Sequence, residues 1–188
     1  REKDLPVLIL TKSTLVTRDI DILKTMKAAV SITVTTFNSS IASVLEEGAP
    51  SPQKRAQALI ELHEAGIPTI LRIDPLIAGI NDKPEEWKEI LSLLSPYVNQ
   101  VVVSTFKPRP DSWKRITTTF PTLQKTKDWY TKKIGNSIYL EDNRRVKLLE
   151  EARATIHSFS LPFSSWREGL ANWNDLPCDG SDLLEINR

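Results

Sequence analysis

The chain has 188 residues, of which 40% are hydrophobic and 26% charged, with 25 Lys and Arg against 24 Asp and Glu. This composition fits one medium-sized globular domain and excludes an intrinsically disordered chain. No stretch approaches the roughly 18 apolar residues of a membrane span, and no secretory signal stands at the start, so we expect a cytoplasmic protein. The single cysteine, Cys178, excludes an internal disulfide and any multi-cysteine metal site or iron–sulfur cluster built from this chain alone.

The first part of the chain predicts two strands separated by a helix. Residues 5–11 (LPVLILT) form a nearly continuous apolar run, which is typical of a parallel strand covered on both faces. A helix is expected from residue 18 or 19, and its buried face would carry Ile22, Leu23, Met26 and Val30. Residues 31–36 alternate apolar and small polar side chains, which predicts a second strand with one wet or ligand-facing side.

Residues 51–106 predict two further strand–helix units. Ser51 and Pro52 fit the N-cap and first position of a helix that Gly66 ends. Residues 68–74 predict a third strand, in which Arg72 and Asp74 share a face and either neutralise each other or orient a ligand. A helix starting at residues 82–84 and a strand at 99–106 follow, the helix burying Trp87, Ile90, Leu91 and Leu94. Repeated units of this kind predict an α/β fold with a parallel sheet, open or curved into a barrel.

The segment Lys107–Lys147 differs in charge from the rest of the chain. It holds 11 Lys and Arg against four Asp and Glu, a local net charge of +7, so that the remainder carries −6. Trp113, Trp129 and Tyr130 are interleaved with these cations. Such a segment is either a solvated surface with aromatic core anchors or a nucleic-acid-binding surface. Beyond it we expect a helix at 141–153, a fifth strand at 155–159 and an ordered loop from residue 164.

Polar residues gather at the carboxyl ends of the predicted strands, where parallel α/β folds build their ligand sites. They are Lys12 and Ser13, residues 35–38, Asp74 with the turn through Gly79, and Ser104 and Thr105. One cation, several hydroxyls and a carboxylate around one mouth suit an organic ligand with a carboxylate or a polyol. Two alternatives are that Lys12 is simply solvent-exposed beside threonines that reflect strand propensity, or that it forms a Schiff base in an aldolase-type enzyme.

Five other residues carry more specific expectations. Glu46 and Arg55 flank the loop into the helix at 51–65 and should form a structural ion pair. His63 should face solvent or complement the dipole at the end of that helix. His157 should be a partly buried, hydrogen-bonded histidine of the fifth strand rather than a catalytic one. Cys178 should be a loop thiol, with a place near the substrate mouth as the alternative.

A series of motifs runs through most of the chain. In order they are Leu10–Ser13, Leu45–Pro52, Arg55, Glu64–Pro68, Asp74–Asp82 (DPLIAGIND), Arg167–Gly169 and Cys178–Ser181. In order and spacing they resemble radical S-adenosylmethionine (radical SAM) enzymes of the spore-photoproduct-lyase-like, DNA-repair-photolyase-like group.

The resemblance implies a partial TIM-type (β/α) barrel. Residues 1–106 would hold the third to sixth strands of a radical SAM (β/α)6 barrel, and residues 107–188 a basic segment, a helix and a C-terminal extension packed on the same domain. In that family a [4Fe–4S] cluster reductively cleaves S-adenosylmethionine to a 5′-deoxyadenosyl radical, which abstracts a hydrogen atom from the substrate. The group's name points to DNA lesion repair and lyase chemistry.

The resemblance also assigns cofactor-binding residues by position. Lys12 and Ser13 would hold the methionine or ribose part of S-adenosylmethionine, and Thr35 the ribose. Asp74 belongs to the same set, and the turn with Ile77 and Gly79 would meet the adenine side, with the glycine allowing close approach of the backbone. No catalytic or metal-binding residue is assigned.

The chain departs from the family in several places. The three-cysteine motif CxxxCxxC and the glycine-rich motif after the second strand are absent, so this chain alone cannot hold the cluster. Ala78 replaces the usual proline, and Trp166 stands where a cysteine is expected, which argues against a paired role for Cys178.

These departures, with Arg1 in place of an initial methionine, predict the C-terminal part of a longer enzyme, inactive by itself. The alternative is a non-catalytic, degenerate half-barrel whose basic segment binds nucleic acid. Either form would leave sheet edges exposed, so self-association is also expected.

Overall fold

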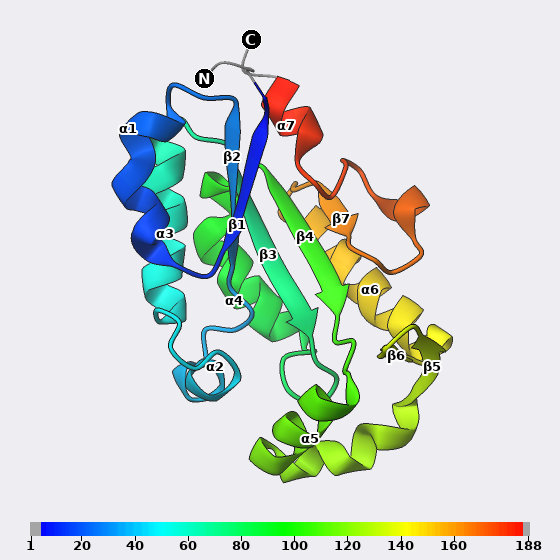
Figure 1. Ribbon diagram of the computed structural model, residues 1–188. Helices are drawn as coiled ribbons and strands as arrows, with labels where there is room; N and C mark the ends of the chain where they lie inside the picture. Colours follow the sequence, from blue (N-terminus) through cyan, green and yellow to red (C-terminus); the bar gives the residue numbers. More distant parts are fainter. Residues whose placement is uncertain (1–4, 186–188) are drawn as a thin grey trace.

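Residues 5–185 are described by the computed structural model. Five strands form one parallel sheet in the order β1–β2–β3–β4–β7 (Figure 1). Their bounds are Val7–Thr11, Ala28–Thr33, Thr69–Leu76, Gln100–Thr105 and Phe163–Ser165. The expected α/β class with a parallel sheet is therefore confirmed, while the partial barrel stays a prediction. No helix in the described part is long and apolar enough to cross a membrane.

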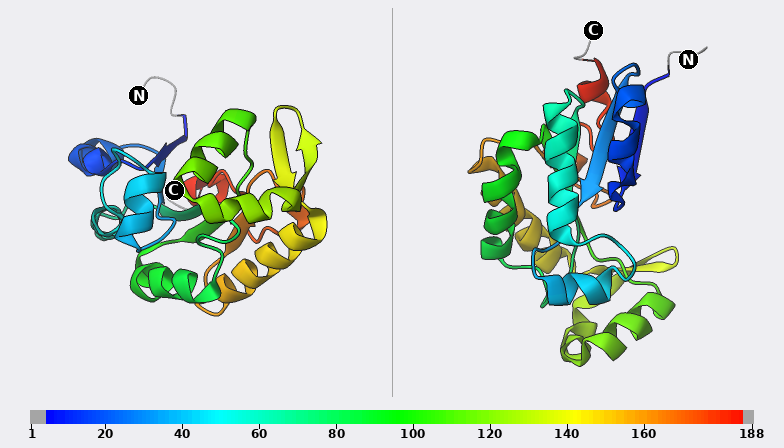
Figure 2. Two further views of the ribbon diagram at one scale, coloured as in Figure 1. Left: turned by 90° about the horizontal axis from the view of Figure 1, so that it is seen from below. Right: turned by 90° about the vertical axis from the view of Figure 1, so that its left-hand side faces the viewer.

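Helices cover one face of this sheet. The right-hand view of Figure 2 shows α3 and α4 on one side of the strands β1 and β2. The elements on this face are the 3₁₀ helix η1 (Thr14–Asp19), α1 (Ile20–Leu23), α3 (Pro52–Glu64), α4 (Pro84–Leu94) and α6 (Asp142–His157). The main core lies between these helices and the sheet, where Ile32, Leu71 and Val101 pack in one cluster with Leu59 and Trp87. Ser51 starts α3 as predicted, because its side chain accepts a hydrogen bond from the Lys54 amide at 3.3 Å.

The C-terminal residues cover part of the opposite face, which we call the tail face (the face of Leu8, Ile70, Arg72, Val102 and Ser164). The tail contains η4 (Ala171–Trp173) and α7 (Ser181–Glu185). Three apolar residues of this face, Leu8, Ile70 and Val102, pack with tail residues. Those tail residues are Leu176, Cys178 and Leu183. Since these three lie in the amino-terminal parts of their strands, the tail closes that end of the face and leaves the carboxyl end to other residues.

The residues between β4 and α6 form a small unit at the carboxyl end of the sheet. It consists of α5 (Pro110–Thr119), η3 (Pro121–Trp129) and the antiparallel hairpin of β5 (Tyr130–Ile134) and β6 (Ser137–Leu140). Ile77 and Ile80, in the turn after β3, form an apolar cluster with Ile116 and Leu123 of this unit. Most of the basic segment is thus packed over the end of β3. The remaining elements are α2 (Ser39–Leu45) and η2 (Ser95–Tyr97).

The helix predicted from residue 18 or 19 is wrong in extent and in its buried face. Helical structure ends at Leu23, and β2 already begins at Ala28, so Val30 is a strand residue. Ile22 and Met26 are 60% and 40% exposed. The small, apolar stretch at residues 28–30 pairs with β1, from Val7 opposite Ala28 onward, and this pairing outweighs the helical spacing.

The last predicted strand is also wrong. Residues 155–157 complete α6, and the fifth strand of the sheet is β7, paired with β4 from Val101 opposite Phe163. The tail after residue 164 is therefore more than an ordered loop, because it begins within β7 and also contains η4 and α7. The apolar residues read as a strand are the buried face of the last helical turns, where Thr155 and Ile156 lie.

The first strand differs from its prediction because it lies at the sheet edge. Within the described residues β1 pairs with β2 alone, and Leu10 is 56% exposed rather than covered on both faces. The second predicted strand, at 31–36, begins three residues earlier and ends at Thr33. By contrast, the stripe of α4 is confirmed, since Trp87, Ile90, Leu91 and Leu94 are all buried.

Candidate functional site

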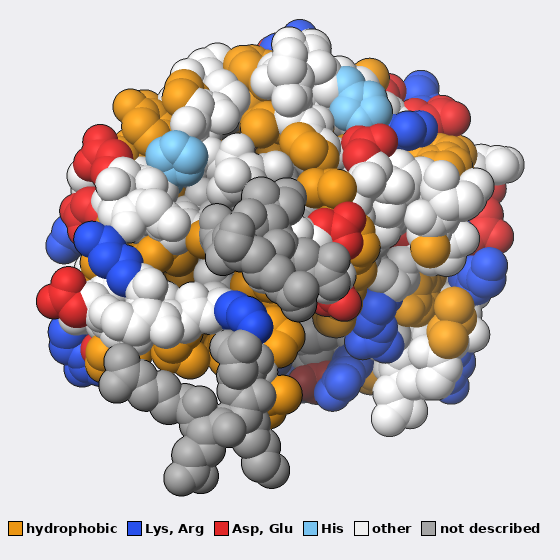
Figure 3. All heavy atoms as spheres, turned by 90° about the horizontal axis from the view of Figure 1, so that it is seen from above, with side chains coloured by type: hydrophobic (Ala, Val, Ile, Leu, Met, Phe, Trp, Pro, Cys, Tyr) orange, Lys and Arg blue, Asp and Glu red, His pale blue; other side chains and the backbone are white. Residues whose placement is uncertain are grey.

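The carboxyl ends of the parallel strands meet at the end of the sheet beside α2 and α5 (Figure 1). We call this region the mouth and define it by one residue at each strand end: Lys12, Thr35, Asp74, Ser104 and Trp166. Ligand sites of parallel α/β folds are built at this end. At the opposite end, Lys and Arg side chains are interspersed with Asp, Glu and apolar ones (Figure 3).

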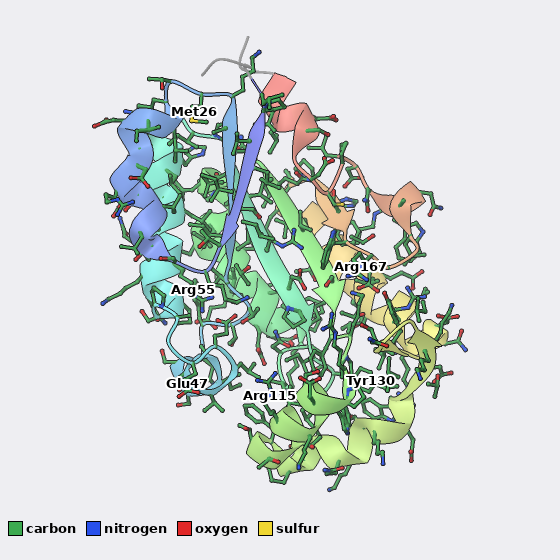
Figure 4. The ribbon with its side chains drawn as sticks, viewed as in Figure 1. Met26, Glu47, Arg55, Arg115, Tyr130 and Arg167 are labelled. Atoms are coloured by element: carbon green, nitrogen blue, oxygen red, sulfur yellow. The ribbon has the colours of Figure 1, made fainter. Side chains whose placement is uncertain are left out.

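Glu46 joins the loops that follow β1 and β2. Its carboxylate lies 3.8 Å from the Lys12 ammonium and accepts a hydrogen bond from Thr35 Oγ1 at 3.4 Å. Arg55 of α3 (Figure 4), fully buried, pairs with the same carboxylate and donates to the Thr33 carbonyl at 2.7 Å. The expected Glu46–Arg55 ion pair is confirmed, and it holds Lys12 and Thr35 next to each other. Lys12 keeps 42% of its side chain exposed, so its charge is open to an anionic ligand.

Ser13 is engaged in local structure. Its side-chain oxygen accepts a hydrogen bond from the Leu15 amide at 3.1 Å and so caps η1. Its own amide donates to Thr11 Oγ1 at 2.8 Å. These bonds fix the loop after β1 and thereby the position of Lys12.

The turn after β3 is fixed by Asn81. This side chain is fully buried and accepts a hydrogen bond from the Ile77 amide at 2.7 Å. Its amide group donates to the carbonyls of Thr35 and Pro75, each at 3.1 Å, while the Trp87 indole donates to the Asn81 carbonyl at 2.9 Å. Asn81 therefore ties the turn to the end of β2, beside Thr35.

The two turn residues expected on the adenine side face the small unit of α5 and η3. Ile77 is 3% exposed and belongs to the cluster with Ile116 and Leu123. Gly79 is exposed with a φ of +86°, and a Cβ there would lie 3.6 Å from a Leu123 methyl. Its amide donates to Asp82 at 2.8 Å. The side-chain positions are thus used for packing, and the amides of Ile77 and Gly79 are both engaged within the turn.

An aromatic cluster holds the hairpin on the same turn. Tyr130 (Figure 4) lies 6.2 Å from Phe106 and 5.1 Å from Trp113, measured between ring centroids. Burial and, to a lesser degree, the charge of Asp82 raise the pKa of the Tyr130 phenol, against a backbone hydrogen bond with Ala78. The phenol therefore stays protonated at neutral pH and anchors the basic segment.

Arg72 and Asp74 neutralise each other at the centre of the mouth. The Arg72 guanidinium lies 2.6 Å from one carboxylate oxygen of Asp74, and Ser104 donates to the other at 2.5 Å. Both side chains lie on the tail face, where β3 meets β4. Of the two predicted alternatives the structure shows mutual pairing, which satisfies a charge pair that would otherwise be costly.

Glu168, in the loop after β7, is the buried carboxylate beside the end of β4. Its side chain has no exposed surface and accepts hydrogen bonds from the Thr105 amide at 2.6 Å and the Lys107 ammonium at 2.5 Å. Arg145 of α6 lies 3.5 Å from its second oxygen. Burial lowers the pKa of Lys107, although the charge and hydrogen bond of Glu168 oppose this shift. Sequence reasoning assigned this glutamate no role, although its Arg-Glu-Gly motif marked it.

The residues present do not fit an iron–sulfur cluster. Cys178 packs with Ile70, Val102 and Leu183 near the amino end of the tail face, so it lies away from the mouth. Among residues 5–185, no group of three or more His, Cys, Asp or Glu side chains is arranged to hold a metal ion.

The two histidines lie outside the mouth. His63, in the last turn of α3, makes an edge-on contact with Tyr97 at 5.9 Å. His157 ends α6 instead of lying in a strand, is 39% exposed, and bonds Asp175 at 2.7 Å. A hollow of about 460 Å³ beside it is lined by Glu150, Arg153, Ala154, His157 and Trp173. Because α6 begins near Glu168 and ends here, this hollow lies toward the amino ends of the strands.

We compared the sequence with those of known proteins. No protein-family profile matches the chain. It is 39% identical over 75 residues to an uncharacterized protein of Methanocaldococcus jannaschii, covering 39% of this chain and 29% of that protein. It is 33% identical over 99 residues to an uncharacterized protein of Acidianus two-tailed virus, covering 50% of this chain and 33% of that protein. The chain thus spans about a third of the length of these relatives.

Solved structures show the same fold at low identity. Spore photoproduct lyase superposes with a TM-score of 0.65 at 16% identity, covering 85% of this chain and 50% of that one. One such structure is a variant with bound AdoMet and dinucleoside spore photoproduct. SuiB of Streptococcus suis, bound to S-adenosylmethionine, superposes with a TM-score of 0.57 at 14% identity, covering 88% of this chain and 34% of that one. The fold is therefore similar to that of radical SAM enzymes.

Proposed function

We propose that the mouth binds S-adenosylmethionine and that the chain is the C-terminal part of a radical SAM catalytic domain. The observation that carries this proposal is the meeting of Lys12 and Thr35 at Glu46, with the turn after β3 tied to the Thr35 carbonyl by Asn81, so that the ends of three adjacent strands are joined. The likeness to proteins solved with S-adenosylmethionine supports it. A fold alone does not fix a reaction, so these side chains are the basis for assigning the ligand.

Each member of this group suits one part of the ligand. The exposed Lys12 ammonium would pair with the methionine carboxylate. Thr35 would bond a ribose hydroxyl, because its Oγ1 makes only a long hydrogen bond, 3.4 Å, to Glu46. The backbone of the turn at Ile77 and Gly79 would line the adenine, and Ser13 would keep the loop of Lys12 in place. Asp74, already paired with Arg72, would set the polarity of the inner wall.

Reductive cleavage of S-adenosylmethionine needs an electron from a [4Fe–4S] cluster, which these residues cannot hold. We therefore propose that a separate cluster-bearing segment acts together with this chain. The edge strand β1 supports this idea, because it is paired on one side within the described residues and carries the exposed Leu10. By itself the chain should bind S-adenosylmethionine weakly and not cleave it.

Titration of this chain with S-adenosylmethionine, followed by calorimetry and by ligand-observed NMR, tests the proposal. We expect saturable binding with a Kd of about 1 mM, equivalent to about −4 kcal/mol. Lys12→Ala should weaken binding about two- to fivefold, the range for one partly solvated ion pair. Thr35→Val should weaken it about two- to tenfold, the range for one hydrogen bond.

Lys24→Ala is the matched control, because Lys24 is an exposed lysine just after α1, outside the mouth. Melting curves of all variants would show whether they remain folded. Absence of saturable binding to the wild-type chain, or equal affinity in the wild type and both mouth variants, would refute the proposal.

A second candidate function is nucleic-acid binding through Lys107–Lys147, which would fit action on damaged DNA or a non-catalytic module. The observation that favours it is the β5–β6 hairpin, which leaves Lys132 and Lys133 exposed beside Ile134, itself 52% exposed. Arg144 stacks on Trp129 at 4.4 Å near the hairpin base. Cations interleaved with aromatic and apolar side chains suit a phosphate backbone and its bases.

Salt dependence separates the two candidates. Binding of a fluorescent single-stranded DNA should weaken steeply between 50 and 200 mM salt in proportion to the phosphates contacted. The double variant Lys132→Ala/Lys133→Ala should lower the affinity and the salt slope, whereas Lys12→Ala should change neither. Unchanged binding in the hairpin variant would refute this second function.

A further inference from the structure

Trp166 brings two arginines together at the β7 end of the mouth. Its amide continues the β4–β7 pairing by donating to the Val103 carbonyl at 3.0 Å, and its indole is 39% exposed. The Arg72 guanidinium lies 5.4 Å from the ring centroid, and that of Arg167 lies 5.3 Å from it. A large aromatic side chain at a strand end thus serves as a support for two cations instead of filling the core.

Arg167 has an unfavourable backbone conformation that its surroundings enforce. Its φ is +57°, a left-handed conformation uncommon for residues other than glycine. The next residue is the buried Glu168, whose bonds to Thr105 and Lys107 fix the loop after β7. Strained conformations of this kind persist where the surroundings enforce them, and they cluster at ligand sites.

The charge of Arg167 is not compensated. Arg72 is paired with Asp74, and Lys107 with Glu168. In the described part of the chain Arg167 has no ion pair or side-chain hydrogen bond, and its contact with Trp166 leaves the guanidinium donors open. Burial lowers the pKa of Lys107, and the nearby charge of Arg167 adds to this shift. Because Arg167 is exposed beside β7 (Figure 4), this end of the mouth carries an accessible excess of positive charge.

We propose that Trp166 and Arg167, supported by Arg72, form a phosphate-binding subsite at the β7 end of the mouth. The planar fork of a guanidinium matches two oxygens of a phosphate group, and the ring fixes its direction. The subsite lies across the strand order from Lys12, so its ligand group is distinct from the proposed methionine carboxylate. Its role as the substrate side of the mouth depends on the proposed function, but its affinity for phosphate does not.

Titration of the full chain with inorganic phosphate at constant ionic strength tests the subsite. The five indole N–H signals are followed by ¹H–¹⁵N NMR, with Trp→Phe variants at 166 and 173 assigning two of them. We expect a saturable shift of the Trp166 signal and none of the Trp173 signal. Arg167→Asn, chosen because Asn tolerates positive φ, should weaken phosphate binding at least tenfold. Arg167→Lys should restore part of the affinity.

Arg153→Gln is the matched control, because Arg153 also faces a tryptophan, Trp173 at 6.0 Å, but lies outside the mouth. It should leave phosphate binding unchanged. Equal phosphate affinity in Arg167→Asn and the wild type, or an unsaturable shift of all indole signals, would overturn the subsite.

A parallel titration with S-adenosylmethionine separates the two proposals. If Arg167→Asn weakens S-adenosylmethionine as strongly as phosphate, the anion bound there is the methionine carboxylate and the separate subsite is overturned. If phosphate shifts Trp166 while S-adenosylmethionine does not bind the wild type, the subsite stands and the proposed function fails.

Discussion

Replacing Glu168 by Gln tests whether the β4 end of the mouth depends on one buried charge. The carboxylate has no exposed surface, and it is the partner of Lys107, 11% exposed, and of Arg145, 8% exposed. Glutamine keeps the shape but brings an amide group toward donors that need an acceptor. Breaking a buried ion pair by removing one partner costs about 3–5 kcal/mol. For a domain of this size that corresponds to a fall in Tm of roughly 6–20 °C.

The pH dependence of the Glu168→Gln effect provides a second check. Burial already lowers the pKa of Lys107 from its ordinary value of 10.5, and loss of Glu168 should lower it further. Between the lowered pKa and 10.5 the folded state binds fewer protons than the unfolded state, so stability rises with pH there. The destabilisation measured by urea unfolding should therefore be largest near pH 7 and shrink toward pH 10.

Glu47→Gln is the control, because Glu47 is exposed beside Glu46 (Figure 4). It should change the free energy of unfolding by no more than about 0.5 kcal/mol. The double variant Glu168→Gln/Lys107→Met should recover part of the loss, since it removes the uncompensated cation. A loss for Glu168→Gln as small as that of the control would refute the buried-anchor argument.

Three further changes probe other parts of the structure. Gly180→Ala should lower the free energy of unfolding by more than Gly66→Ala. Both glycines have positive φ, but only at Gly180 would the new Cβ lie 2.7 Å from a side-chain methyl of β3. Equal losses in urea unfolding would contradict this. Leu10→Lys, at a residue 56% exposed on the edge strand, should reduce concentration-dependent self-association in sedimentation without lowering Tm, and unchanged association would place the contact elsewhere. Burial favours a raised pKa for Asp175, but hydrogen bonds from the Phe163 amide and His157 outweigh it and lower the pKa below 3.8. The stability lost in Asp175→Asn at pH 7 should therefore shrink as the pH falls below about 3.8. A loss of stability that does not change with pH would show that this pairing is not the cause.

Local sequence patterns predict an element correctly where it buries one regular stripe of apolar residues. The helix at α4 was predicted because Trp87, Ile90, Leu91 and Leu94 follow the helical period and Pro84 marks its start. The strand β7 was missed because only three residues pair, and the apolar pattern just before it belongs to α6. The exposed Leu10 was missed for a different reason: an apolar sequence shows that a strand can be buried, not which neighbours are present.

The candidate site was predicted only in part. The strand-end rule placed Lys12 and Thr35 at one mouth, and the structure shows that Glu46 lies between them; their role toward a ligand stays a prediction. The contacts that organise the mouth join residues far apart in the chain. Asn81 and Thr35 are separated by 46 positions, and Glu168 and Thr105 by 63. No local pattern reports such pairs, because they form only once the parallel strands are aligned.

The charges of the mouth are arranged so that its buried carboxylates are satisfied from within the protein. Glu46 pairs with Arg55, Asp74 with Arg72, and Glu168 with Lys107 and Arg145. Among the described residues that follow the strands, two cations stay accessible at opposite ends of the five-strand order: Lys12 beside β1, which shares Glu46 with Arg55, and Arg167 after β7. Four strand spacings separate them, up to about 19 Å.

A mouth of this kind should hold two anionic groups independently. At such a separation the effects of two substitutions on binding should add within about 0.5 kcal/mol. Lys12→Ala should therefore weaken S-adenosylmethionine alone, Arg167→Asn should weaken phosphate alone, and the double variant should show both losses unchanged. Calorimetric titration of the four proteins with each ligand measures this directly. A loss in the double variant that differs clearly from the sum would mean that both cations meet one ligand group, and the two-ended arrangement would be wrong.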